Sequence, residues 1–304
     1  MIEIFLNVVA PIFIMASLGA VLAKWKKVAA PPLSNATLFV FSPALIFNSL
    51  YKSQLPVELS FRILVFVALL ATSLYLLSWV IARLGRFEST MESAFLLSTL
   101  FMNSGNYGIP VALLAFGQEG LERAALFFVV QAVLGTTLGV YLASRSQAVG
   151  ASAFLEVLKM PMVYAAVAAL SLNLLHITPP QVLLRPMEIM GAAAIPSMLL
   201  VLGIQLAGGM VRENYPAVTA ASLIRLVISG GLAFGLTSLL GISGVTQQVL
   251  IVLASMPTAV FPIILATSFN ARPQFVTSVV LVSTLSSLLT LTGLITFLKS
   301  VALG

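Results

Sequence analysis

The sequence predicts an all-α integral membrane protein with ten membrane-spanning helices, arranged as two halves of five helices each. Of the 304 residues, 60% are hydrophobic and only 8% are charged, whereas soluble domains carry about 25% charged residues. Apolar runs of roughly 20 residues, the length that crosses a bilayer, recur along the whole chain. Prolines repeat at matching positions of the two halves. No stretch is long enough for a soluble domain, so we expect one membrane domain over residues 1–304.

The apolar runs are separated by connectors that hold nearly all the charged residues and turn formers. Gly85, Gly117 and Gly241 are typical of such connectors, because glycine ends or interrupts helices. The expected spans lie at about 2–23, 31–50, 61–82, 92–116, 122–144, 157–175, 187–210, 217–240, 246–268 and 274–298.

The basic residues predict the orientation of the chain in the membrane. With the N-terminus outside, nine of them fall on the cytoplasmic side and five on the outer side. The cytoplasmic set is Lys24, Lys26, Lys27, Arg83, Arg86, Arg145, Lys159, Arg212 and Arg272, and the outer set is Lys52, Arg62, Arg123, Arg185 and Lys299. Because cytoplasmic loops carry an excess of basic residues, we expect both termini to be extracytoplasmic. The scattered charges do not form the stripe that nucleic-acid binding requires.

The two halves repeat through their prolines. Four pairs are separated by 148 to 153 residues: Pro11 and Pro161, Pro31-Pro32 and Pro179-Pro180, Pro43 and Pro196, and Pro110 and Pro262. The halves cover residues 1–144 and 157–298. Because each half has five spans, an odd number, the second half must insert upside down relative to the first. Such inverted repeats are typical of secondary transporters.

Two of the expected spans contain residues that interrupt a helix. In span four, Gly105, Gly108 and Pro110 lie within residues 103–110, which read NSGNYGIP. In span nine the interruption runs over residues 256–262 and contains Pro257 and Pro262. Proline removes a backbone donor, and in hydrocarbon a broken helix persists only where it is buried in protein or lines a cavity. Two such breaks in corresponding positions indicate a transporter's substrate site.

These motifs carry a resemblance to a known family. Residues 103–110, residues 254–260 (ASMPTAV) and residues 283–286 (STLS) resemble the auxin efflux carrier family, whose bacterial members transport organic anions. The similarity covers essentially the whole chain. It implies that spans four and nine cross at mid-membrane. It also implies a static scaffold of spans 1, 2, 6 and 7, and a mobile domain of spans 3–5 and 8–10.

The chain departs from the family pattern in two places. Plant members with a hormone role commonly have a long central loop, whereas here only about residues 145–156 separate the halves. Relatives often have an asparagine in the second crossover, where this chain has Val260, Phe261 and Pro262. The resemblance is therefore to a bacterial-type member, and the implied substrate is a small organic anion other than auxin.

Five polar residues are candidates for substrate binding. Asn103, Ser104 and Asn106 could hydrogen-bond a carboxylate beside the N-terminus of a half-helix, or could satisfy the broken backbone themselves. Tyr107 could close the site or pack in the core. Gln131 in span five could line the same cavity or make an interhelical hydrogen bond.

Arg225 is the only strong cation candidate inside a span. It could attract the anion, or its side chain could extend to the cytoplasmic interface, and we favour the interface. Gly135 and Gly139 form a small-xxx-small pair, which is more often an internal contact than a dimer seam, so a homodimer is left open.

Several function classes are excluded by what the sequence lacks. It contains no cysteine and no aspartate, and its nine glutamates lie at span ends or in loops. No metalloprotease or phosphate-loop motif is present, so we expect no enzyme activity, no cofactor and no metal. We expect a secondary-active or potential-driven carrier, an exporter, that moves a small organic anion by an elevator type of alternating access. The alternatives are a sodium-coupled symporter of the bile-acid type and a non-transporting membrane sensor.

Overall fold

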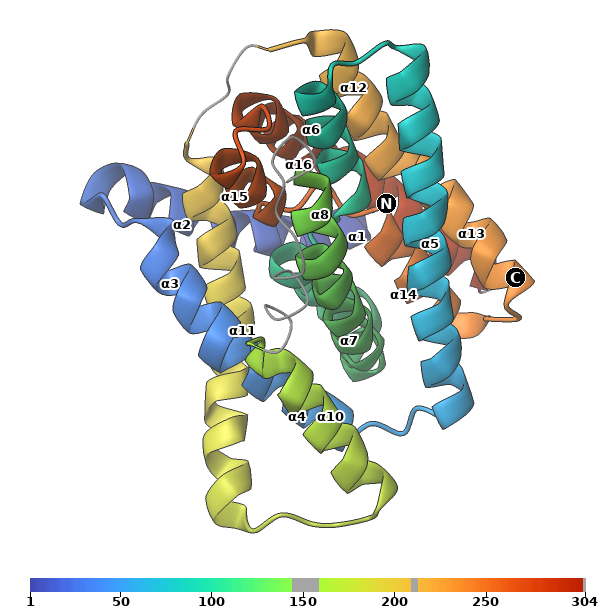
Figure 1. The fold of residues 1–304 in the computed structure, drawn as a ribbon. Helices are drawn as coiled ribbons and strands as arrows, with labels where there is room; N and C mark the ends of the chain where they lie inside the picture. The colour runs from blue at the N-terminus through green and yellow to red at the C-terminus, as the bar shows by residue number, and fades with distance from the viewer. Residues whose placement is uncertain (144–158, 209–212, 303–304) are drawn as a thin grey trace.

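The computed structural model describes residues 1–143, 159–208 and 213–302, which are almost entirely helical (Figure 1). Within these ranges there is no β-strand, and one isolated antiparallel bridge joins Met102 to Thr258. The expected all-α class is confirmed for this part of the chain. Arg145, Arg212 and the expected connection between the halves lie outside the described residues.

Short π-helical segments, labelled η, are continuous with several of the α-helices. The elements are α1 (Ile2–Ile4), η1 (Phe5–Val9), α2 (Ala10–Lys26), α3 (Ala30–Ala36), η2 (Thr37–Phe41), α4 (Ser42–Tyr51), α5 (Val57–Leu84), α6 (Ser89–Leu100), η3 (Ser104–Gly108), α7 (Ile109–Leu134), η4 (Gly135–Gly139), α8 (Val140–Ala143), α10 (Pro161–Leu174), α11 (Gln181–Leu206), α12 (Tyr215–Leu223), η6 (Ile224–Ile228), α13 (Ser229–Leu239), α14 (Gly244–Ala254), α15 (Phe261–Ser268) and α16 (Pro273–Ala302).

Seven helical runs in the described residues are long and apolar enough to cross a membrane. They are Ile2–Lys26, Ala30–Tyr51, Val57–Leu84, Ser104–Ala143, Gln181–Leu206, Tyr215–Leu239 and Pro273–Val301. Helices α10 and α14 are shorter but also apolar. The run Ser104–Ala143 is divided by a kink at Gly117, where φ is 66° and ψ is −155°. Only a residue without a side chain adopts this backbone conformation easily, so the kink lies at the connector that the sequence predicts.

The interruptions are narrower than the sequence predicts. Residues 101–103 lie outside helices, and a helix resumes at Ser104, so Gly105, Gly108 and Pro110 belong to the helix that follows the break. In the second half the chain is non-helical over residues 255–260, which include Pro257, and Pro262 lies in the first turn of α15. The expectation that Pro110 forms the first break is therefore wrong.

The π-helical segments explain why Pro110 does not end its helix. Pro11, Pro43 and Pro110 each stand two residues after one of them, namely η1, η2 and η3. Proline clashes with the carbonyl group four residues earlier, whereas a π turn bonds five residues back and is wider. The wider turn accommodates the ring, so the helix continues past the proline.

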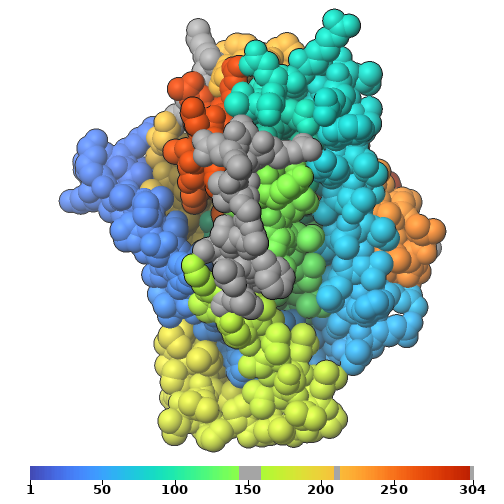
Figure 2. Space-filling view, viewed as in Figure 1, coloured from blue at the N-terminus to red at the C-terminus, as the bar shows by residue number. Residues whose placement is uncertain are grey.

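The helices form two groups. The first group contains α2, α3, α4, α10 and α11, in which α11 packs on α2, α3 and α4, and α10 packs on α4. The second group contains α5, α6 and α12–α16, while η3 and α7 contact both groups. Figure 1 shows the blue and yellow helices of the first group at the left and the lower end. In the space-filling view of Figure 2, α5 lies along the opposite side.

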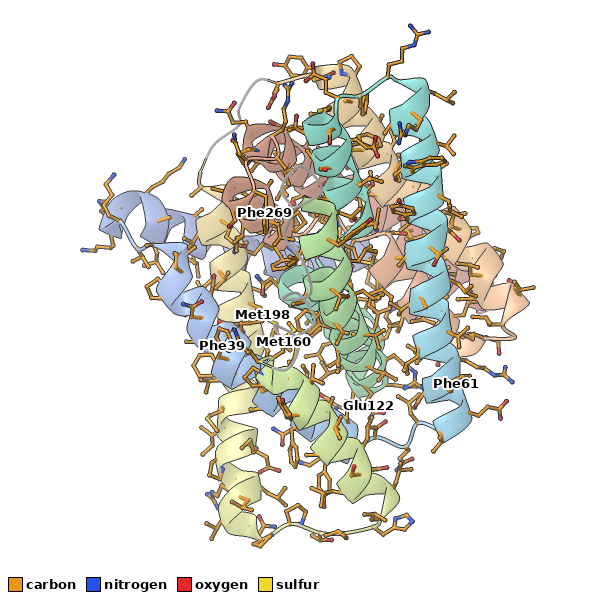
Figure 3. The ribbon with its side chains drawn as sticks, in the orientation of Figure 1. Phe39, Phe61, Glu122, Met160, Met198 and Phe269 are labelled. Atoms are coloured by element: carbon orange, nitrogen blue, oxygen red, sulfur yellow. The ribbon has the colours of Figure 1, made fainter. Side chains whose placement is uncertain are left out.

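The outer face of the bundle is apolar. Trp25 and Val182 are each 81% exposed, and Phe39 and Phe61, labelled in Figure 3, are 49% and 65% exposed. Soluble monomers rarely expose large contiguous apolar patches. Hydrocarbon chains in contact with these side chains remove that cost, so the surface fits a membrane environment.

Helices α2 and α11 approach each other closely through two glycines. A methyl group added at Gly19 would lie 2.9 Å from the carbonyl carbon of Leu200. One added at Gly203 would lie 2.6 Å from the carbonyl carbon of Ala16 and 2.9 Å from the nitrogen of Ala20. Small residues that let backbones touch are the usual basis of helix association in membranes. Helices α2 and α11 therefore pack with their backbones in contact.

The substitution Gly203→Ala should lower the thermal unfolding midpoint of the purified protein, because the added methyl group meets backbone atoms that cannot move independently. Gly293→Ala is the matched control, since nothing lies within 4 Å of its added methyl group and alanine is favoured over glycine in a helix by about 1 kcal/mol. An unchanged midpoint for Gly203→Ala would show that the α2–α11 contact tolerates separation.

Candidate functional site

Hydrogen bonds join the two helix breaks, residues 101–103 and residues 255–260. The backbone N–H of Asn103 donates to the carbonyl oxygen of Pro257 at 2.8 Å, and the N–H of Ala259 donates to Phe101 at 2.9 Å. The hydroxyl of Thr258 donates to the carbonyl oxygen of Ser98 at 2.7 Å. Backbone groups inside a membrane must find partners within the protein. Each break therefore supplies partners for the other, although the breaks lie half a sequence apart.

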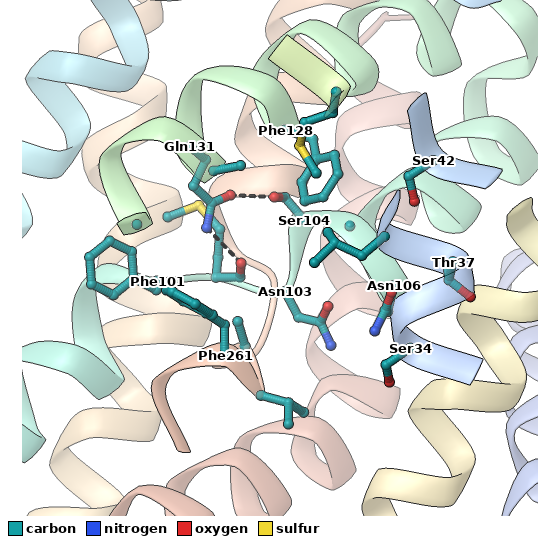
Figure 4. Close-up of a pocket in the computed structure, with 18 of the residues that line it drawn as sticks. Ser34, Thr37, Ser42, Phe101, Asn103, Ser104, Asn106, Phe128, Gln131 and Phe261 are labelled. Atoms are coloured by element: carbon teal, nitrogen blue, oxygen red, sulfur yellow. Dashed lines mark hydrogen bonds between the residues drawn. The ribbon is translucent and has the colours of Figure 1, made fainter. Parts of the chain in front are cut away.

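A cavity of about 210 Å³ lies at this junction. Its walls come from α3, η2, α4, α10 and α11, and from residues 101–103, η3, α7, η4 and residues 259–264. Figure 4 shows the polar side chains that project toward it. None of the described residues that line it is charged. The cavity thus has walls from both helix groups, and its described lining is mostly apolar, with a few polar side chains and no fixed charge.

Four of the predicted binding residues line this cavity: Asn103, Ser104, Asn106 and Gln131. The Ser104 hydroxyl donates to Oε1 of Gln131, whose Nε2 donates to the carbonyl oxygen of Met102 at 2.6 Å (Figure 4). Ser104 and Gln131 therefore satisfy each other and the broken backbone, and Gln131 both lines the cavity and bonds between elements. In contrast, Nδ2 of Asn103 is buried and has no hydrogen-bond partner among the described residues, so this donor is available to a ligand.

Tyr107 does not line the cavity. Its side chain is fully buried, its ring meets the edge of Phe13 with centroids 5.9 Å apart, and its hydroxyl is 3.1 Å from that of Ser287. The sequence left open whether Tyr107 closes the site or packs, and the structure shows packing.

The glycines around the break serve close packing. A methyl group at Gly105, which lines the cavity, would lie 2.7 Å from the ring of Phe128. One at Gly108 would lie 2.8 Å from the side chain of Leu253. Gly135 and Gly139 face Phe101, so this pair makes the internal contact that we favour from the sequence.

The interface role expected for Arg225 is wrong. The side chain is completely buried, and its guanidinium donates to the carbonyl oxygens of Thr99 at 2.6 Å and of Ala254. A longer contact of 3.4 Å reaches the carbonyl oxygen of Met256. Arg225 is not part of the cavity wall. It bonds to the C-terminal ends of α6 and α14, the helices that precede the two breaks.

The electrostatics of the cavity come from helix ends instead. A helix leaves its first N–H groups without partners in the helix and carries a partial positive charge at its N-terminus. The first turn of η3, with Ser104, Gly105 and Asn106, lines the cavity, as do Val260 and Phe261 at the start of α15. Two helix N-termini thus face one space, an arrangement that favours anions.

The sequence reasoning missed the opposite wall. Ser34 in α3 and Gln205 in α11 line the cavity. Oγ of Ser34 and Oε1 of Gln205 are buried, and neither has a hydrogen-bond partner in the part of the chain that the structure describes. Figure 4 shows the side chains of Asn103 and Asn106 extending toward Ser34. A weak signal for Ser34 and Gln205 was present, since both are polar residues inside otherwise apolar spans. Nothing in the sequence indicated that they face the break.

Comparisons with known proteins identify the family of the chain. The family model described as "Membrane transport protein" matches residues 4–295. An uncharacterized transporter of Methanothermobacter thermautotrophicus is 28% identical over 86% of this chain and 87% of its own length. An uncharacterized transporter of Methanocaldococcus jannaschii is also 28% identical, over 84% and 86%. A Rhizobium meliloti protein named "Putative malonate transporter" is 25% identical over 89% and 88%. The chain therefore belongs to the membrane transport protein family, the auxin efflux carrier family that its motifs resemble, and it is a multi-pass membrane transporter and not an enzyme.

Proposed function

We propose that this transporter carries a small organic anion across the cell membrane, the inner membrane in a Gram-negative bacterium, with the substrate bound in the cavity between the two breaks. The observation that carries the proposal is the unpartnered amide of Asn103, which lies at a helix N-terminus in a cavity between two helix groups. A buried donor without a partner costs free energy. A carboxylate at this position would satisfy it.

The size and chemistry of the cavity favour a compact substrate. Its volume of about 210 Å³ is below the ~300–1,000 Å³ of pockets for drug-sized ligands, so a molecule of a few carbon atoms fits. Donors from Asn103 and from the first turn of η3 suit a carboxylate, and Ser34 and Gln205 provide polar atoms on the opposite wall. The Rhizobium meliloti relative, whose name points to malonate, supports a small carboxylate.

The arrangement of helices supports alternating access of the elevator type. In this proposal the first helix group is the scaffold, and α5–α8 move together with α12–α16 and carry the broken helices past it. The chain would form ten membrane segments in two inverted halves, 1–144 and 157–298, with the breaks crossing at mid-membrane. The cavity has walls from both groups, so a sliding motion between them would open it to alternate sides.

The driving force would be the membrane potential acting on the anion itself. No aspartate exists in the chain, and no glutamate is among the described residues that line the cavity. A transported proton needs a titratable carrier, and intramembrane carboxylates commonly serve as one. In a cell that is negative inside, the potential drives an anion outward, so the proposed direction is export.

Replacing Asn103 with alanine should weaken malonate binding about tenfold or more, the effect of losing a hydrogen bond to a charged group worth ~1.5–3 kcal/mol. Tyr107→Phe is the control, because the Tyr107 hydroxyl bonds Ser287 away from the cavity, and its affinity should not change. Calorimetry on purified protein measures both. Equal affinity in Asn103→Ala and wild type would leave this amide with a structural role only.

Flux of malonate in proteoliposomes should follow an imposed potassium-diffusion potential when the sodium and pH gradients are held at zero. A potential of 100 mV is worth about 2.3 kcal/mol per charge, so a monovalent anion would accumulate roughly fiftyfold on the positive side, and malonate, a dianion near neutral pH, would accumulate further. Flux that ignores the potential and follows a sodium gradient would instead identify a sodium-coupled symporter of the bile-acid type.

Both chain ends should be extracytoplasmic, given the nine-to-five distribution of basic residues. A reporter that is active only in the cytoplasm, fused after Gly304, should be silent, and the same reporter placed after Arg86 should be active. Activity after Gly304 would contradict the proposed orientation.

A further inference from the structure

The carbonyl oxygens at the ends of α6 and α14 form a cluster that requires a positive charge. The last carbonyl groups of a helix have no partner within it and carry a partial negative charge. Here Thr99 at the end of α6, and Ala254 and Met256 around the end of α14, direct their oxygens toward one point. Two helix C-termini that meet inside a membrane would repel each other without a cation between them.

Arg225 supplies that cation. Its guanidinium reaches three carbonyl oxygens and contacts the hydroxyl of Ser229 at 3.3 Å, and this hydroxyl is also bonded to the carbonyl oxygen of Ala254 at 2.7 Å. The side chain is 0% exposed. No salt bridge between Arg225 and a carboxylate is found in the described residues. Its compensation therefore comes from neutral oxygens.

Among the described residues a second arginine, Arg123, is also buried, but its partners differ. Arg123 is 8% exposed, but it pairs with the carboxylate of Glu119 at 2.6 Å and with the hydroxyl of Thr246 at 2.9 Å. Arg123 is thus a buried arginine that is paired with a half-exposed carboxylate. Arg225 instead occupies an environment of carbonyl and hydroxyl oxygens, which are the ligands that alkali cations bind in proteins. In transporters with broken helices, unwound carbonyls and half-helix C-termini are the groups that hold a coupling ion.

We propose that Arg225 takes the place of a bound monovalent cation at the junction of the breaks. The tethered guanidinium holds α6 and α14 in register, and through them the strand-like pairing of Asn103 with Pro257. The oxygen cluster is then always filled, and the substrate site forms without an external ion. The conclusion that transport needs no coupling ion rests on the proposed function, whereas the assignment of Arg225 to a cation position does not.

The test removes the side chain and offers free cations. Purified Arg225→Ala should unfold at a lower temperature than wild type in choline chloride. Replacing choline with sodium, potassium or millimolar guanidinium at equal ionic strength should raise its midpoint by about 2 °C or more beyond any shift in wild type, since a ligand that binds only the folded state stabilises it. Arg123→Ala is the control, because it loses an ion pair with a carboxylate, and these cations should not raise its midpoint beyond the shift in wild type.

Two outcomes would overturn the proposal. One is a midpoint of Arg225→Ala equal to that of wild type in choline, and the other is a lowered midpoint that none of the three cations raises. If Arg225→Ala yields no folded protein, the unfolding midpoints of Arg225→Lys and Arg225→Met are compared instead, because only lysine keeps the charge. An equal lowering of the midpoint in both variants would contradict the proposal. The measurement uses no substrate, so its failure is distinct from a failure of malonate transport.

Discussion

The structure depends on one constraint: every backbone polar group inside a membrane must be satisfied by the protein itself. Two helices are interrupted, and each interruption frees carbonyl and N–H groups. The pairing of residues 101–103 with residues 257–259 satisfies part of this demand. Arg225 satisfies the carbonyl groups at the ends of α6 and α14. Neither break has these partners without the other, which explains why two distant motifs occur in one chain.

The two kinds of helix end, with opposite partial charges, lie in different places. The C-termini of the half-helices meet at Arg225, which is fully buried. The N-termini, at Ser104 and Phe261, face the cavity. Positive partial charge is therefore concentrated where a ligand can bind, and negative partial charge where a fixed cation lies. A binding site for an anion can be electropositive in this way without any lysine or arginine among the described residues of its wall.

A neutral wall also suits a carrier. A transporter must release its substrate as well as bind it, and a full charge in the site would hold an anion more strongly than dipoles and amides do. The cavity has walls from both helix groups, and in the first group α2 and α11 are closely packed at Gly19 and Gly203. Motion between the groups, with little change inside either, would then alter access to the cavity while the hydrogen bonds between the breaks stay intact.

The sequence by itself determined the helical class, the family and the approximate location of both interruptions, because these follow from apolar run length, proline and glycine content and local motifs. It also identified Asn103, Ser104 and Gln131, since polar residues are conspicuous in apolar spans. It could not show which of these side chains lacks a hydrogen-bond partner and is available to a ligand. That depends on distances between elements: Gln131 reaches Ser104 and Met102, whereas the amide nitrogen of Asn103 reaches no hydrogen-bond partner within the described residues.

Only the tertiary structure decided the roles of Arg225, Ser34 and Gln205. An arginine near a span end suits extension to the interface as well as burial, and the difference lies in whether oxygens from α6 and α14 surround it. Ser34 and Gln205 become part of the cavity because the first helix group packs against the breaks. Such roles arise from contacts between different helices, as when Arg225 reaches Thr99 and Ala254, which lie 126 and 29 positions away in the chain, and local sequence patterns contain no information about that pairing.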